Sequence, residues 1–174
     1  MPNFASNISM MFTEHDFLDR IGAAAKAGFK GVEFLFPYDF PAEEIKARLN
    51  EHAMTQALFN TYPGSWDGNE RGLAAVPGRE ADFEAAIEQA LGYATVLGNN
   101  CIHAMSGLVP QGASRDAHRA TIVANLKRAA PVAASQGKTL IIEPINTRDI
   151  PGYFLNYQAQ ARAIIDDVGA GNVC

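Results

Sequence analysis

Short apolar strands alternate with amphipathic helices along this chain, and that alternation constrains its fold more than any other feature. Apolar runs predict strands at 4–11, 31–36, 55–60, 101–106 and 139–145, with a further strand beginning at 172. Apolar residues at helical spacing predict helices at about 17–27, 41–51, 80–97, 114–135 and 157–168. Strand followed by helix, repeated along the chain, predicts a parallel α/β sheet with right-handed crossovers.

Two architectures fit this repeat. An open doubly wound sheet usually carries a glycine-rich phosphate turn after an early strand, and the sequence contains neither G-x-G-x-x-G nor G-x-x-x-x-G-K-[ST]. A (β/α)8 barrel has eight such units in typically about 250 residues. The 174 residues therefore predict an incomplete (β/α)8 TIM barrel. We expect a single partial domain over 1–174, with five β/α units and the start of a sixth strand, as in a fragment of a longer barrel.

The overall charge and the cysteine usage narrow the class of protein. A net charge of −5 and a pI near 5.3 argue against a nucleic-acid surface. Cys101 and Cys174 match neither a zinc motif nor a disulfide framework, which favours a reducing, cytoplasmic location. No apolar run approaches the roughly 18 residues of a membrane span, so we expect no membrane partner.

One carboxylate interrupts an otherwise apolar strand. Glu143 follows the apolar run 140–142 and precedes Pro144, which imposes an extended backbone and marks the strand's end. Active residues of parallel barrels lie at such C-terminal strand ends. A carboxylate buried there needs an ion pair or a bound cation to offset its desolvation. The pattern indicates Glu143 as the leading catalytic and metal-binding candidate, with a structural ion pair as the alternative.

Four further polar side chains are candidates for binding a substrate. They are Asn60 at the end of the third strand, Arg71 in the glycine-rich connection 61–79, His103 on the fourth strand and Asn146 after the fifth. Arg71 could clamp a carboxylate through two N–H groups, and a solvated loop arginine is the alternative. A lone strand histidine such as His103 is more often a hydrogen-bonded core residue than a ligand.

Other polar and aromatic residues have mainly structural interpretations. Glu33 is expected to pair with a lysine such as Lys30. Trp66 and Phe154 could close a lid over the pocket, with ordinary loop packing as the alternative. The remaining histidines are expected on solvated helix surfaces: His15, His52 and His118.

Several segments together resemble the hydroxypyruvate isomerase family. They are NISMMF, GFKGVEFLFPYDFPAEE, ALFN with a following Gly-x-Trp and ERG, PGRE, and LIIEPIN followed by DIPGYFL. The related 2-oxo-tetronate isomerases share the pattern, and both groups belong to the xylose-isomerase-like barrels. The resemblance runs over the whole chain, and IEPIN-x-x-DIPG is a long and specific signature.

The resemblance implies a divalent metal ion, Mg²⁺ or Mn²⁺, held by four side chains. The first of these matches Glu143, and the other three, an aspartate, a glutamine and a second glutamate, lie on later strands of the family, beyond residue 174. The implied reaction converts a small hydroxylated keto acid into its aldehyde isomer, as in hydroxypyruvate to tartronate semialdehyde. A metal stabilises the enediolate while a carboxylate moves the proton.

Alternative functions remain open at this stage. A non-catalytic binding or assembly module would use open sheet edges to pair with another chain, which includes homo-oligomer formation. A sugar epimerase on the same barrel is a further option. Endonucleases of this fold use several metals and histidine-rich strand ends, whereas this sequence offers only His103 at such a position.

Overall fold

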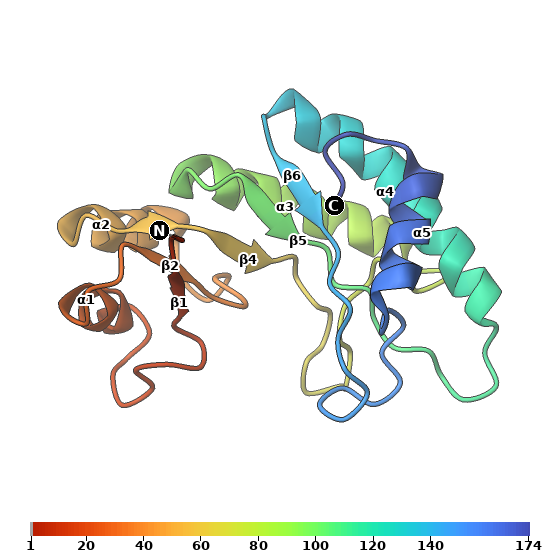
Figure 1. The fold of residues 1–174 in the computed structure, drawn as a ribbon, viewed down its shortest axis with the longest axis horizontal. Coiled ribbons are helices and arrows are strands. Elements are labelled where there is room, and N and C mark those ends of the chain that lie inside the picture. The colour runs from red at the N-terminus through yellow and green to blue at the C-terminus, as the bar shows by residue number, and fades with distance from the viewer. Residues whose placement is uncertain (1) are drawn as a thin grey trace.

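The computed structural model describes residues 2–174 and shows a curving row of parallel strands flanked by helices (Figure 1). One sheet contains β1 (Ala5–Asn7), β2 (Gly31–Glu33) and β3 (Thr55–Gln56), and the next contains β4 (Leu58–Asn60), β5 (Cys101–His103) and β6 (Thr139–Ile141). The helices are α1 (Asp19–Lys26), α2 (Ala42–Glu51), α3 (Glu80–Leu97), α4 (Arg115–Ser135) and α5 (Gln158–Val168). Each helix packs on the next along the chain. The predicted incomplete α/β barrel is confirmed.

The predicted strand 55–60 connects the two sheets. Its first half, β3, pairs with β2, and its second half, β4, pairs with β5. Between them, the N–H of Ala57 donates to the carbonyl of Val32 at 2.9 Å, so the bonding to β2 continues through the break. The chain therefore bends without losing its hydrogen bonds, which is how a parallel sheet begins to close into a barrel.

The end of the chain extends the same row of strands. Val173 forms a parallel bridge with Leu140 of β6. The N–H of Cys174 donates to the carbonyl of Leu140 at 3.0 Å, and the N–H of Ile142 donates to the carbonyl of Cys174 at 2.8 Å. The start of a strand expected at 172 therefore lies where the prediction placed it, beside β6.

Helix boundaries follow local capping signals. The Ser114 hydroxyl accepts a hydrogen bond from the N–H of Ala117 at 3.2 Å and begins α4, as expected. Gly98 ends α3 in the left-handed conformation, with φ of 83°. The ammonium of Lys138 donates to the carbonyls of Ala94 and Asn99, which stabilises the same helix end. No helix in residues 2–174 combines the length and the apolar character needed to cross a bilayer.

The loops that leave the C-terminal ends of β4, β5 and β6 are tied together. Gly72 bridges Ser106, and Leu108 bridges Tyr153. The buried Tyr153 hydroxyl accepts a hydrogen bond from the N–H of Ser106 at 2.8 Å. The loops after β4 and β6 descend together at the lower edge of Figure 1. These contacts hold the loops at the C-terminal ends of the strands in a fixed arrangement.

The structure differs from the expectations for His118 and His52 and decides between the two interpretations left open for Phe154. His118 is buried rather than solvated, because its ring stacks on Phe154 at 6.1 Å between centroids. Phe154 is 1% exposed, so it belongs to the core and does not form a lid. His15 is exposed as expected, whereas His52 is half-buried at the C-terminal end of α2.

Candidate active site at the strand ends

A cavity of about 420 Å³ opens at the C-terminal ends of the strands. This volume is in the range of small-molecule sites. Its apolar lining includes Met10, Phe36, Trp66 and Met105. Its polar lining residues come from both sheets and from the loop after β6: Asn7, Glu33, Asn60, His103, Glu143, Asn146 and Asp149. Three of the four predicted substrate-binding residues and the predicted catalytic glutamate thus share one cavity.

Glu143 lies just beyond β6 and lines this cavity. Its side chain is 61% exposed, so the expectation of a buried carboxylate is wrong. Partial desolvation, and then the nearby charge of Glu33, raise the pKa of the Glu143 carboxyl. Its accessibility to solvent makes it available to a ligand that enters the cavity.

His103 is the buried polar residue next to Glu143. Its Nδ1 lies 3.1 Å from the Asn60 Oδ1 and 3.7 Å from the Glu143 Oε2. Burial lowers the pKa of His103 to about 4, so the imidazole is neutral at neutral pH. A neutral imidazole that faces two oxygens through Nδ1 carries its proton there, which leaves Nε2 as an acceptor. That Nε2 is buried without a hydrogen-bond partner in residues 2–174.

Glu33 makes a different contact from the one predicted. Its Oε1 accepts a hydrogen bond from the Asn7 Nδ2 at 3.0 Å, and no salt bridge to Lys30 forms in residues 2–174. Asn7 and Glu33 are register partners on the parallel strands β1 and β2. That register is the signal that could have paired them from sequence, since both residues end their strands.

Asn146 shapes the loop that follows β6. Its Oδ1 accepts hydrogen bonds from the N–H groups of Arg148 and Asp149, at 3.0 and 2.9 Å. Its Nδ2 donates to the Asp149 Oδ2 at 2.7 Å. Both ends of the amide are therefore engaged within the loop at the cavity wall.

Arg71 lies beside the cavity lining rather than in it. Its guanidinium stacks 3.9 Å above the Trp66 ring and donates to the carbonyls of Trp66 and Glu70. Trp66 in turn packs against Phe36, with ring centroids 5.3 Å apart. Trp66 thus forms part of the cavity mouth, and Arg71 is one aromatic ring away from it.

Tyr153 is a site-forming residue that sequence reasoning missed. It is fully buried, and burial raises the pKa of its hydroxyl to about 12. Its contact with Ser106 joins the loops after β5 and β6 close to Glu143. No local pattern in the sequence marks this contact, because its two partners are far apart along the chain.

The donor set suits part of a metal site. Carboxylate oxygens are the ligands that Mg²⁺ and Mn²⁺ prefer, and Glu143 offers an accessible one. Within residues 2–174, no group of three or more His, Cys, Asp or Glu side chains is arranged to hold a metal ion. Among residues 2–174, Glu143 is therefore suited to be one ligand of a metal ion that needs further ligands.

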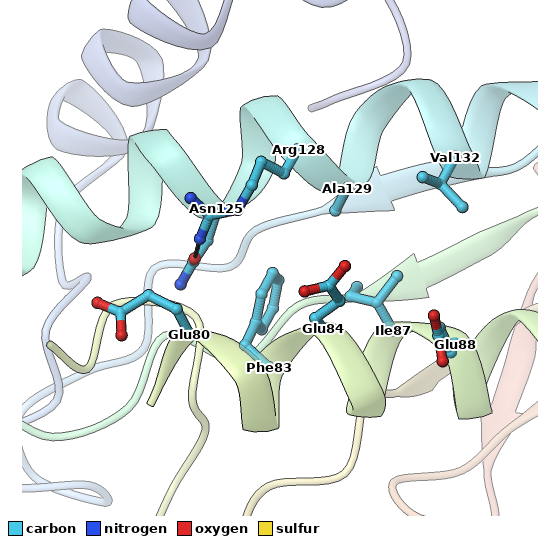
Figure 2. Close-up of a pocket in the computed structure, with 9 residues that line it drawn as sticks. All are labelled: Glu80, Phe83, Glu84, Ile87, Glu88, Asn125, Arg128, Ala129 and Val132. Atoms are coloured by element: carbon cyan, nitrogen blue, oxygen red, sulfur yellow. Dashed lines mark hydrogen bonds between the residues drawn. The ribbon is translucent and has the colours of Figure 1, made fainter. Parts of the chain in front are cut away.

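A second pocket lies between α3 and α4, outside the strands (Figure 2). Its volume is about 50 Å³, which holds little more than a few water molecules. Figure 2 shows Asn125 and Arg128 of α4 joined by a hydrogen bond, with Glu80 and Glu84 along α3. This pocket is too small for an organic substrate. The cavity at the strand ends is the candidate site because the predicted polar residues line it.

Comparison with known proteins points in the same direction. The family model described as xylose isomerase-like TIM barrel matches residues 21–173. The 2-oxo-tetronate isomerase of Cupriavidus necator is 59% identical over 173 residues, which is 99% of this chain and 66% of that protein. The hydroxypyruvate isomerase of Escherichia coli is 44% identical, over 99% of this chain and 67% of that protein. The chain thus spans about two thirds of the length of these relatives.

Solved structures share the fold. A Brucella melitensis protein, described as an AP endonuclease of family 2, superposes with a TM-score of 0.97 at 47% identity, covering 100% of this chain and 67% of its own. A D-psicose 3-epimerase solved in the presence of D-fructose superposes with a TM-score of 0.74 at 21% identity, covering 91% of this chain and 56% of its own. The similarity to the epimerase concerns the fold alone, because the sequences are only 21% identical.

Proposed function

Because this chain belongs to the family of xylose isomerase-like TIM barrels, we propose that it forms part of the active site of an isomerase of small hydroxylated keto acids. One observation carries the proposal: the accessible Glu143 carboxylate lies at a strand end, inside a cavity of about 420 Å³. The relatives named hydroxypyruvate isomerase and 2-oxo-tetronate isomerase support the substrate class.

The proposed reaction moves a carbonyl group to the adjacent carbon. In hydroxypyruvate, a proton leaves C3, an enediolate forms across C2 and C3, and a proton returns to C2 while a hydroxyl proton passes from O3 to O2. The product is tartronate semialdehyde. Glu143 accepts the carbon-bound proton, as a positioned carboxylate within reach of the reacting carbon can.

The surroundings of Glu143 suit this role. A divalent ion such as Mg²⁺ or Mn²⁺, with Glu143 as one of its ligands, would offset the negative charge of the enediolate. The neutral His103 lies beside Glu143, with its Nδ1 3.7 Å from the Glu143 Oε2, and the Glu143 side chain stays accessible. Asn60 holds the imidazole in the tautomer with its proton on Nδ1.

The remaining predicted residues act on the substrate in this proposal. Arg71 binds the substrate's carboxylate after leaving the face of Trp66, because a guanidinium matches a carboxylate with two N–H groups. Asn146 holds the loop after β6, which forms part of the cavity wall. It acts on the substrate by fixing the shape of that wall.

The test measures isomerisation of hydroxypyruvate and of a 2-oxo-tetronate, with and without a chelator. Glu143→Gln is expected to lower kcat by about a hundredfold or more, since proton transfer by a positioned side chain contributes that much. Glu84→Gln is the matched control, because it makes the same change on α3, outside this cavity. A Glu143→Gln variant with full turnover would contradict the assignment.

A further inference from the structure

The proposed chemistry leaves one wall of the cavity without a role. Glu33 lines the cavity from β2, on the other sheet from β5 and β6. It is close enough to Glu143 for its charge to act on that carboxyl. The proton transfer proposed above does not require it.

A chain of hydrogen bonds fixes the orientation of Glu33. The Asn7 Nδ2 donates to the Glu33 Oε1 at 3.0 Å, and the N–H of Ser9 donates to the Asn7 Oδ1 at 3.1 Å. The Ser9 hydroxyl accepts from the N–H of Leu35 at 2.9 Å, which ties this chain back to the end of β2. Among residues 2–174, no hydrogen bond reaches the Glu33 Oε2. The result is a preorganised acceptor at the cavity wall.

The charge of the lining determines which part of a substrate this wall can face. Glu33, Glu143 and Asp149 are all acidic and all line the cavity. On the β1–β2 wall, Glu33 repels the carboxylate of a keto acid, whereas its carboxylate oxygen is a strong acceptor for a hydroxyl group. The β1–β2 wall therefore complements the hydroxylated end of a substrate rather than its acid end.

We propose that Glu33, held by Asn7, is a specificity residue that accepts a hydrogen bond from a substrate hydroxyl beyond the two reacting carbons. This rests on the isomerase function proposed above and deepens it. In four-carbon keto acids, a hydroxyl group on C4 donates this hydrogen bond to the Glu33 Oε2. Hydroxypyruvate has only three carbons and no such hydroxyl. The site therefore favours the four-carbon class.

Binding of two unreactive reduced acids tests this without turnover. The probes are 2,3,4-trihydroxybutanoate and the same acid without its 4-hydroxyl, titrated calorimetrically into the protein. Loss of the hydroxyl is expected to weaken binding to the unaltered protein by about tenfold, as for a hydrogen bond to a charged group. For the Glu33→Ala variant, the affinities for the acids with and without the 4-hydroxyl are expected to differ by less than about twofold.

Two further variants complete the design. Glu33→Gln keeps the side-chain length and an oxygen for Asn7, and is expected to give an intermediate dependence on the hydroxyl. Asp149→Asn removes a charge from the same lining and is expected to retain the tenfold difference. An equal dependence on the 4-hydroxyl in the unaltered protein and in both Glu33 variants overturns the proposal, as does binding of neither acid by the unaltered protein. Absent isomerisation with intact Glu33-dependent binding would contradict only the proposed reaction.

Discussion

At the scale of single residues, the hydrogen bonds of buried polar groups decide what the site can do. His103 is 2% exposed, and its Nδ1 is within hydrogen-bond distance of the Asn60 Oδ1, at 3.1 Å. Glu33 and Asn7 form a comparable pair on the neighbouring sheet. In both pairs an amide from one strand orients an ionisable side chain from the next. These two parts of the site are therefore preorganised by hydrogen bonds between neighbouring strands.

The burial of His103 predicts an acid-sensitive fold. Its pKa falls from 6.5 to about 4 on folding, so between these values the unfolded chain binds a proton that the folded chain does not. The contribution of His103 to stability is therefore complete above pH 6.5 and is lost as the pH falls toward 4, by about 3 kcal/mol in total. Urea unfolding at pH 7 and pH 4.5 should show a smaller decrease for His103→Gln, which does not titrate. Identical decreases in both proteins would contradict this origin.

At the scale of elements, the contact between the loops after β4 and β5 depends on a glycine. Gly72 has φ of 121°, and a Cβ at this position would lie 2.4 Å from the carbonyl oxygen of Met105. Gly78, in the same connection, also has positive φ, at 83°, but a Cβ there would meet nothing within 4 Å. A side chain at position 78 would meet only the cost of positive φ, whereas one at position 72 would also overlap the backbone of Met105.

This difference predicts unequal effects of two alanine substitutions. Gly78→Ala is expected to cost about 1 kcal/mol of unfolding free energy, the ordinary cost of positive φ in a non-glycine residue. Gly72→Ala adds a clash with backbone and is expected to cost at least about 2 kcal/mol more. Chemical denaturation measures both variants. Equal losses would show that the loop moves away without cost.

At the scale of the whole molecule, the partial barrel leaves strand edges to be paired. Within residues 2–174, β1 pairs on one side only, with β2. The adjacent Phe4 is 73% exposed. Unpaired strand edges with nearby apolar side chains favour association with another chain.

Self-association of the 174-residue chain is therefore expected at this edge. Light scattering should show a mass that rises with protein concentration, and Phe4→Lys should reduce the rise because a charge opposes edge-to-edge pairing. Tyr157→Lys is the control, since Tyr157 is similarly exposed, at 71%, but precedes α5. A monomer at all concentrations would count against an assembly role for the edge.

Much of the architecture could be predicted from the sequence by itself. The helix at 80–97, the Ser114 cap and the strand beginning at 172 follow from apolar spacing and from glycine and serine positions. The place of Glu143 at a strand end follows from the apolar run before it and from Pro144. These signals are local, because each depends on residues within a few positions of one another.

Only the tertiary structure decided how the polar residues are distributed around the site. It pairs Glu33 with Asn7 instead of Lys30, buries Phe154 against His118, and leaves Glu143 open to the cavity. Each outcome depends on the distance and orientation between segments that are remote in sequence. Such distances are set by how the strands curve and how the helices pack, and no local pattern of residue types encodes them.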